Sequence, residues 1–336
     1  MKRIGISLAV VLLLFSMLFP YASADYLDKS RSELADELSE RRAGLLSSSF
    51  TSEDRTAILE TEYLSIYLNG DFYVESSWQG PQIILPVVLV NNSEMDVSVQ
   101  TRYVSVNGFG TEAIFSPAVH AGKKEKAEIT VSLRYTNVVE IEDFEDIELS
   151  FHISEGTSGV GKTVYDSDPV CIFADYTSGY YSLISDSELF SAYNEIRDEI
   201  ESRDLAEENR KILADEEGIQ IFVTGDFSVF TSSGGKQILE LPVEIINHSE
   251  QDISLKIKYA SINDWDCQSF FSFSGHNIKS HKMERAVVQF LLDDTDAVEL
   301  SDISEIEFQF YAIDYYNLSK EIFVAEPTVF TNIQDS

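Results

Sequence analysis

The stretch that most resembles a chemical site is GTSGVGKT, from Gly156 to Thr163. It fits the pattern G-x-x-x-x-G-K-[ST], in which backbone N–H groups and a lysine hold the phosphates of ATP or GTP. Such a loop follows a buried parallel strand and opens a helix whose N-terminus faces the phosphates. Here the chain continues as VYDSDPVCIF, and its β-branched residues and Pro169 disfavour a helix. We therefore interpret the stretch as a hairpin tip between two strands and expect no nucleotide binding.

The histidines and cysteines show no catalytic pattern. The five His residues form no H-E-x-x-H motif, and no G-x-S-x-G is present. Cys267, His276 and His281 lie close together in the sequence and could hold a metal, but the matching part of the first half lacks the set. We therefore predict no metal site and no cofactor. Two interpretations stay open for Cys171, a buried thiol in the apolar run VCIF or a bridge to Cys267.

The net negative charge of the chain disfavours some classes of binding partner. It has 58 Asp and Glu against 24 Lys and Arg, a formal net charge of −34. Adjacent carboxylates such as EIEDFED are expected from this composition, so we assign no catalytic residues to them. An acidic surface repels nucleic-acid phosphates and anionic membranes, so we expect neither partner. Diffuse binding of cations such as calcium is an alternative, although no D-x-[DN]-x-[DN]-G loop occurs.

The N-terminus predicts export. Lys2 and Arg3 precede an apolar run from Ile4 to Phe19, and Ala22-Ser23-Ala24 follows. This is the order of a secretory signal peptide, with cleavage expected after Ala24. The run is too short to favour a membrane-spanning helix. We therefore predict a secreted, extracellular bacterial protein.

An internal repeat organises the rest of the chain. NNSEMDVSVQTRYVSVN, residues 91–107, returns as NHSEQDISLKIKYASIN, residues 247–263, with eight of 17 positions identical at an offset of 156. Chance would give about one identity. LNGDF matches VTGDF, and VVEIEDFEDIELSF matches AVELSDISEIEFQF. A repeated unit of this size predicts two domains rather than a solenoid of short repeats.

Each repeat begins with a helical pattern. Apolar residues fall at three-and-four spacings, which predicts one stripe of an amphipathic helix; they are Leu27, Leu34, Leu38 and Leu45 in the first copy and Leu189, Tyr193, Ile196 and Ile200 in the second. Ser30 with Glu33, and Ser185 with Glu188, fit the S-x-x-E capping box. We expect each helix to pack against the β-structure that follows it.

Short alternating runs follow each helix. In the second copy Ile253, Leu255 and Ile257 alternate with polar residues, and turns such as NNSE separate the runs, which indicates an antiparallel immunoglobulin-like β-sandwich. The fold class is therefore mainly β with helical segments (α+β). The predicted boundaries are a signal peptide at 1–24, an N-terminal helical segment at 25–61, sandwich one at 62–175, a helical connector at 176–217, sandwich two at 218–331 and a tail at 332–336.

These runs also carry a family resemblance. The sequences VNNSE and INHSE, VSVNG and FSPAVHAGKKEKAEITV together resemble secreted immunoglobulin-like domains of unknown function from Gram-positive bacteria. The resemblance covers both sandwiches but not the helices, and it is weaker in the second copy, where the AGKK turn is missing. It implies an immunoglobulin-like fold and an extracellular role, and it implies no catalytic residues.

The function class that remains is binding. We expect a secreted, non-catalytic interaction protein whose partner is a protein or carbohydrate at the cell exterior. The alternatives are a secreted hydrolase with a site between the two sandwiches, or a structural spacer on the wall side of the cell. Aromatic residues in loops suit protein or sugar contacts, and the candidates are Trp265, Phe109, Tyr180, Tyr181, Tyr315 and Tyr316.

Overall fold

The computed structural model describes residues 29–48, 57–77, 80–138, 143–175, 180–184, 187–208, 210–271, 277–331 and 333. In these ranges the chain is mainly β, in several antiparallel sheets, with two α-helices, α2 (Arg31–Ser48) and α3 (Ser187–Glu207). The predicted mainly β character is therefore confirmed. Neither helix has the length and apolar character needed to cross a membrane, as far as the described ranges extend.

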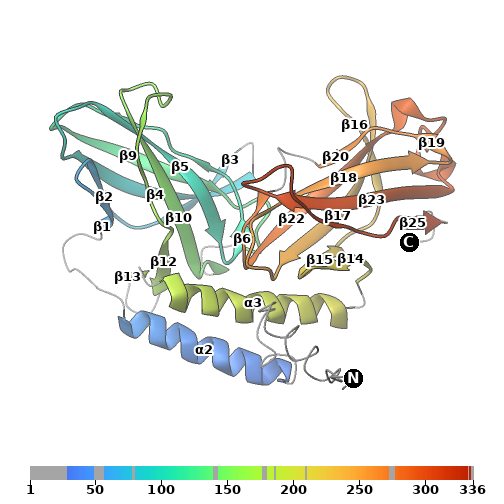
Figure 1. Ribbon diagram of the computed structural model, residues 1–336, viewed down its shortest axis with the longest axis horizontal. Coiled ribbons are helices and arrows are strands. Elements are labelled where there is room, and N and C mark those ends of the chain that lie inside the picture. Colours follow the sequence, from blue (N-terminus) through green and yellow to red (C-terminus); the bar gives the residue numbers. More distant parts are fainter. Residues whose placement is uncertain are drawn as a thin grey trace, which may run out of the picture.

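The strands form two lobes above the helices (Figure 1). The outer sheet of the first lobe has the order β1-β2-β4-β9-β7, with β3 also paired to β4. Its strands are β1 (Ala57–Glu60), β2 (Leu64–Leu68), β3 (Tyr73–Ser77), β4 (Gly80–Asn91), β7 (Ala113–Ile114) and β9 (Lys124–Ser132).

The outer sheet of the second lobe has the order β19-β18-β23-β24, with β21 and β25 paired to β18 and β23. Its strands are β18 (Ile253–Ile262), β19 (Trp265–Asp266), β21 (Asn277–Ile278), β23 (Glu305–Asp314), β24 (Glu321–Val324) and β25 (Thr328–Thr331). Two short 3₁₀ turns, Leu292–Asp294 and Leu300–Asp302, precede β23.

A third, large sheet runs through both lobes in the order β13-β12-β10-β5-β6-β22-β17-β15-β14. Four more strands join it, because β8 pairs with β5, β11 with β10, β16 with β17 and β20 with β22. The first-lobe strands are β5 (Val97–Val106), β6 (Phe109–Gly110), β8 (Ala118–Val119), β10 (Asp146–Glu155), β11 (Thr163–Asp166), β12 (Val170–Asp175) and β13 (Tyr180–Ile184). The second-lobe strands are β14 (Ile212–Glu216), β15 (Ile219–Val223), β16 (Ser228–Thr231), β17 (Gln237–Asn247), β20 (Ser269–Phe271) and β22 (Lys282–Leu291).

The short strand β6 joins the two halves of this large sheet. Phe109 on β6 pairs in parallel with Met283 on β22, and the Met283 N–H donates to the Gly108 carbonyl at 3.1 Å. Gly108 has φ 83, and a Cβ there would lie 3.0 Å from Arg197 Nε and 3.2 Å from Met283 Cε. Glycine is therefore required where helix and both lobes meet.

Each lobe has its own apolar core. In the first lobe the buried cluster is drawn from residues between Ile58 and Ile172, and in the second from residues between Leu213 and Ile333. Both combine side chains from two facing sheets, as the alternating patterns require. A smaller cluster of Phe109, Leu205, Phe222, Ile246 and Met283 lies where the lobes and α3 meet.

The most similar part of the repeat builds the same turn in both lobes. Buried Asn91 donates from its amide to the Met95 and Val119 carbonyls at 2.8 Å, and its Oδ1 accepts the Ser93 N–H at 2.9 Å. Asn247 makes the corresponding bonds to Gln251, Ile278 and Ser249 in the second lobe. A buried amide needs all its partners. The turn structure therefore explains why Asn91 and Ser93 recur as Asn247 and Ser249.

The helices pack differently from the prediction. Antiparallel α2 and α3 lie against each other below the lobes (Figure 1), and buried Ile196 on α3 contacts buried Leu34 on α2. Tyr193 packs on Cys171 and Phe173 of β12 in the first lobe, with ring centroids 5.5 Å apart for Phe173.

The far end of α3 contacts the other lobe, through Leu205 packed on Phe222 and Ile246. Helix α3 therefore contacts both lobes, and the expectation that its stripe packs against the lobe that follows is wrong, because Tyr193 packs on the first lobe and Ile196 on α2. Sequence periodicity shows that a helix has an apolar face, but it does not show which surface covers that face.

Other predictions about local structure can be compared directly. The Ser30–Glu33 capping box forms, because the Ser30 N–H donates to Glu33 Oε2 at 2.7 Å and the Glu33 N–H donates to Ser30 Oγ at 3.3 Å. Ser185 lies outside the described residues. The ranges predicted as helical also contain strands, with β1 inside 25–61 and both β13 and β14 inside 176–217.

The structure also tests the predictions for the phosphate-loop pattern and for the two cysteines. Residues 156–162 form the tip between antiparallel β10 and β11, and the next element is β12, so the predicted hairpin is confirmed. Cys171 is buried, Cys267 is half-buried, and both thiols are free. The structure therefore contains no disulfide between Cys171 and Cys267.

Candidate functional site

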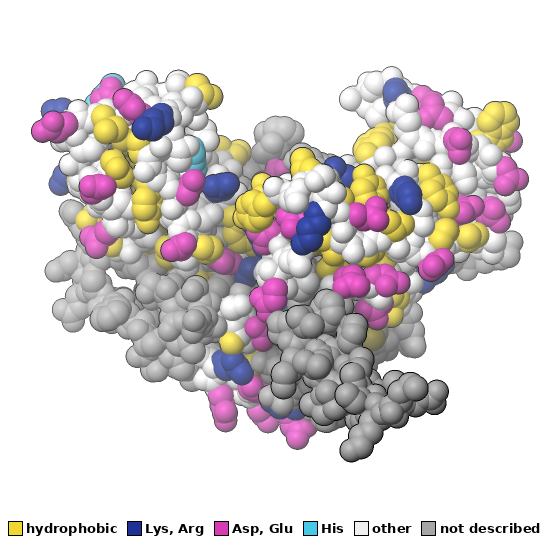
Figure 2. All heavy atoms as spheres, viewed as in Figure 1, with side chains coloured by type: hydrophobic (Ala, Val, Ile, Leu, Met, Phe, Trp, Pro, Cys, Tyr) yellow, Lys and Arg dark blue, Asp and Glu magenta, His cyan; other side chains and the backbone are white. Residues whose placement is uncertain are grey.

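A hollow lies between the two lobes. It has a volume of about 530 Å³, and its walls come from β5, the β6–β7 segment and β9 on one side and from residues 277–285 and Tyr315 on the other. In the space-filling view the molecule is hollowed between the lobes (Figure 2). We call this hollow the inter-lobe cleft.

The lining of the inter-lobe cleft has more basic than acidic side chains, although the chain as a whole is acidic. Four cationic side chains line it, against the two anionic side chains of Glu112 and Glu284. The cations are Arg102, Arg134, Lys279 and Arg285. Three of the four are ion-paired, Arg102 with Asp166, Lys279 with Asp252 and Arg285 with Glu244, so their positive charge is partly compensated. In a chain of net charge −34, a lining that presents mainly cationic side chains still favours an anionic ligand over a cationic one.

Lys279 is surrounded by aromatic rings. Its ammonium lies 4.9 Å from the Tyr315 ring centroid, 5.2 Å from that of Tyr316 and 5.9 Å from that of Tyr103, all within the range of cation–π attraction. Burial opposes its charge, but its hydrogen bonds to Asp252 at 2.6 Å and to the Tyr316 hydroxyl raise the pKa of Lys279 above its usual value. The ammonium therefore stays charged.

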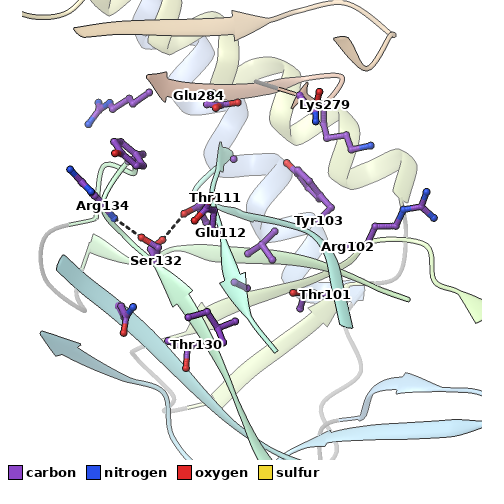
Figure 3. A pocket seen from close by; sticks show the side chains of 18 of the residues that line it. Thr101, Arg102, Tyr103, Thr111, Glu112, Thr130, Ser132, Arg134, Lys279 and Glu284 are labelled. Atoms are coloured by element: carbon purple, nitrogen blue, oxygen red, sulfur yellow. Dashed lines mark hydrogen bonds between the residues drawn. The ribbon is translucent and has the colours of Figure 1, made fainter. Parts of the chain in front are cut away.

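Tyr103 faces Lys279 across the cleft. Figure 3 shows Arg102 and Tyr103 extending from β5, while Lys279 and Glu284 extend from the second lobe. Burial, with the nearby Glu148 carboxylate, raises the pKa of Tyr103 well above 10. The phenol therefore remains neutral at physiological pH and keeps a proton that it can donate.

The floor of the cleft is held by hydrogen bonds within the first lobe. The Thr111 hydroxyl donates to the Ser132 carbonyl at 2.6 Å, and the Arg134 N–H donates to Ser132 Oγ at 3.4 Å (Figure 3). The Thr111 bond ties the segment after β6 to β9, and the Arg134 bond closes the turn at the end of β9. Because the wall is fixed before any ligand arrives, binding would need little ordering of these residues.

Arg285 joins the wall to the lobe junction. Its Nε donates to the buried Glu244 carboxylate at 2.8 Å, and its Nη1 donates to the Thr136 carbonyl of the first lobe at 3.3 Å. Its guanidinium also covers the Phe109 ring at 4.8 Å. The predicted contact residue Phe109 is fully buried beneath it, so a role as an exposed loop aromatic is wrong. The apolar character that suggested binding reflects burial at the junction.

A second, shallower hollow continues from the cleft and shares Thr101 and Arg102 with it. It also contains His152 and Asp166, whose side chains are 2.7 Å apart, while Arg102 pairs with the same carboxylate at 3.1 Å. The His152 hydrogen bond, aided by Arg102, lowers the pKa of Asp166. Together the two hollows form one polar surface across β5.

The other predicted contact residues are scattered. Tyr315 lines the cleft, and the exposed Tyr316 packs edge-on against it with centroids 5.0 Å apart. Trp265 is 54% exposed on β19, outside the cleft lining. Tyr180 and Tyr181 lie on β13, paired with Asp175 and Ala174.

The sequence did not predict the four basic side chains that line the cleft. Arg102, Arg134, Lys279 and Arg285 come from four separate segments, and no spacing links them. Tyr103 also carries no signal, because its repeat partner Tyr259 is an exposed strand residue bonded to Glu307. Only the arrangement of the lobes brings these side chains together.

The cleft presents more hydrogen-bond donors than carboxyl groups. Among the described residues that line it there is no His, Cys or Asp, and the carboxyl groups are those of Glu112 and Glu284. Arg, Lys, Tyr, Asn and Thr side chains provide hydrogen-bond donors, and the tyrosine rings and Ile114 provide apolar contact. This combination suits recognition of a ligand with anionic and ring or apolar parts.

Comparisons with known proteins give no assignment. No protein-family model matches the chain, and no curated protein matches it. A crystal structure of a protein of unknown function from Porphyromonas gingivalis W83 is 11% identical, and the match covers 74% of this chain and 91% of that one with a TM-score of 0.20. A similarity of this size supports no conclusion about fold or function.

Proposed function

We propose that the protein is a secreted, non-catalytic binding protein of two immunoglobulin-like sandwiches, and that the inter-lobe cleft binds an anionic ligand. The observation that carries the proposal is the cleft lining, with four cations and three tyrosines in a chain of net charge −34. The partner is an acidic carbohydrate or an acidic protein segment outside the cell, because both combine carboxylates with groups that pack on tyrosine rings.

The architecture is consistent with this role. Separate cores in the two lobes, and the same buried Asn turn in each, support tandem sandwiches. The large shared sheet and α3 would keep the two walls of the cleft at a fixed spacing. The signal-peptide pattern ending at Ala24 supports an extracellular site of action.

Isothermal titration of the mature protein tests the proposal. The probes are an oligogalacturonate, an oligoglutamate peptide and an uncharged malto-oligosaccharide. We expect saturable binding of one acidic probe, weakened by added salt because charge contributes. Lys279→Gln removes the ammonium inside the tyrosine cluster and should weaken binding at least about tenfold, the loss expected for one charged hydrogen bond.

The matched control is Lys236→Gln. Lys236 is an exposed lysine in the β16–β17 turn, outside the cleft lining, so this change removes the same charge elsewhere. An equal loss of affinity in both variants would mean that binding follows net charge rather than the cleft. Failure of both acidic probes to bind would contradict an anionic ligand, and cleavage of a probe would favour the hydrolase alternative.

A further inference from the structure

Three side chains from distant segments converge beside α3, apart from the inter-lobe cleft. Glu195 lies on α3, Glu250 in the turn after β17, and His281 immediately before β22. One potential ligand atom from each residue lies within 4.8 Å of the other two. No sequence spacing predicts this cluster, and the grouping of His281 with Cys267 and His276 considered from sequence alone differs from it. His276 lies outside the described residues.

His281 is buried with one ring nitrogen unsatisfied. The residue is 3% exposed, its Nε2 lies 3.3 Å from Glu250 Oε1, and its buried Nδ1 has no hydrogen-bond partner in the part of the chain that the structure describes. Its backbone has φ 51, a conformation that is uncommon for a residue other than glycine. Nε2 is the ring nitrogen that faces Glu250, so an ion held between these two side chains would bind Nε2 and take the place of the present hydrogen bond.

The electrostatics of the cluster favour a cation. Glu195 and Glu250 bring two carboxylates to one imidazole, and the negative charge of Glu195 also reaches Asp198. The neighbouring cations already have partners, since Arg197 pairs with Asp146 at 2.6 Å and Lys282 with Glu148 at 2.8 Å. A divalent ion bound by the cluster would neutralise both carboxylates.

We propose that Glu195, Glu250 and His281 bind a divalent transition-metal ion of the Zn²⁺ type. Zinc prefers imidazole and carboxylate ligands at about 2.0–2.2 Å in a tetrahedron, whose edge is then about 3.3–3.6 Å. The distance from His281 Nε2 to Glu250 Oε1 is 3.3 Å. Calcium and magnesium prefer sets of oxygen ligands, so an imidazole selects against them.

The ion would link α3 to the second lobe. Glu195 comes from the helix, and the other two ligands come from one end of the β17–β22 pairing, where Asn247 pairs with Lys282. Three protein ligands leave a fourth position for water. Glu250 has a side chain 65% exposed, so the ion can enter from solvent and Glu250 can adjust to it.

The test is a Zn²⁺ titration of chelator-treated mature protein, followed by calorimetry. Excess Ca²⁺ is included so that it occupies the acidic surface. We expect one Zn²⁺ per chain and a higher melting temperature, because a ligand that binds only the folded state stabilises it. Glu250→Gln and His281→Gln should each weaken Zn²⁺ binding at least about tenfold.

His120→Gln is the matched control, since His120 is an exposed histidine that pairs with Asp96 elsewhere in the first lobe. It should bind Zn²⁺ like the wild type. Glu250 is exposed, so Glu250→Gln keeps the test valid if His281→Gln fails to fold. Equal Zn²⁺ affinity in Glu250→Gln, His120→Gln and wild type, or no binding above the Ca²⁺ background, would overturn the proposal.

Discussion

Asp198 on α3 gives the most quantitative prediction. Its side chain is fully buried, and neither carboxylate oxygen has a hydrogen-bond partner among the described residues. Burial raises its pKa to about 7, although the cations Lys282 and Arg197 act in the opposite direction, and Glu195 raises it further. Near neutral pH the folded protein therefore holds a proton that the unfolded chain releases.

The direction of the pH effect follows from that proton. Between pH about 4 and about 7 the folded state binds more protons than the unfolded state, so stability falls as pH rises. A pKa about three units above 3.8 corresponds to a total loss of about 4 kcal/mol, since each unit is 1.36 kcal/mol. Of this, roughly 2.5 kcal/mol is lost between about pH 5 and about pH 8.

Asp198→Asn removes this titration and keeps the shape of the side chain. We expect the variant to be more stable than the wild type, with an advantage that grows by roughly 2.5 kcal/mol from about pH 5 to about pH 8. The measurement is urea unfolding at several pH values, followed by circular dichroism and by tryptophan fluorescence. Coincident transitions from both probes are needed before free energies are assigned.

Asp36→Asn is the control, because Asp36 is exposed on α2 and the change removes the same charge. Its stability should follow the wild-type pH profile. If Asp198→Asn also keeps the wild-type pH profile, then Asp198 does not bind its proton in the folded state. That result would refute the argument from burial.

Two further changes test the junction and the helix pair. Gly108→Ala should destabilise the protein by about 2–4 kcal/mol, because it adds left-handed strain and crowds Arg197 and Met283. Gly122 has φ 63, and a Cβ added there would meet open space. Gly122→Ala should therefore lower the free energy of unfolding by only about 1–2 kcal/mol in the same urea assay. Equal losses in the two variants would contradict the crowding at Gly108. Ile196→Ala should cost about 2–5 kcal/mol. A double-mutant cycle of Ile196→Ala with Leu34→Ala should show a coupling of about 0.5–3 kcal/mol, and strict additivity would mean that α2 and α3 do not pack there.

The parts of the fold that sequence predicted best are those set by local patterns. The alternation in Ile253–Ile257 produced a strand, the S-x-x-E pattern at Ser30 produced a cap, and the glycine-rich loop produced a hairpin tip. Each depends on a few neighbouring residues and on backbone preferences that act over that distance.

The arrangement of the lobes could not be predicted in the same way. Phe109 and Trp265 are repeat partners with similar local patterns, yet Phe109 is buried at the lobe junction and Trp265 is 54% exposed. The difference arises because β6 pairs with β22, whereas β19 pairs only with β18 in the described part of the chain. The cationic side chains of the cleft are brought together by the same packing of one lobe against the other. The sequence pattern within one repeat therefore does not predict them.

The inter-lobe cleft as an anionic-ligand site is tested most directly by a crystal structure of the mature protein with its tightest acidic probe. The proposal predicts ligand density between Arg102 and Tyr103 on one wall and Lys279 on the other, with a ligand carboxylate within hydrogen-bond distance of a cleft cation. Density at the Trp265 hairpin, or on the outer sheet of either lobe with an empty cleft, would contradict it.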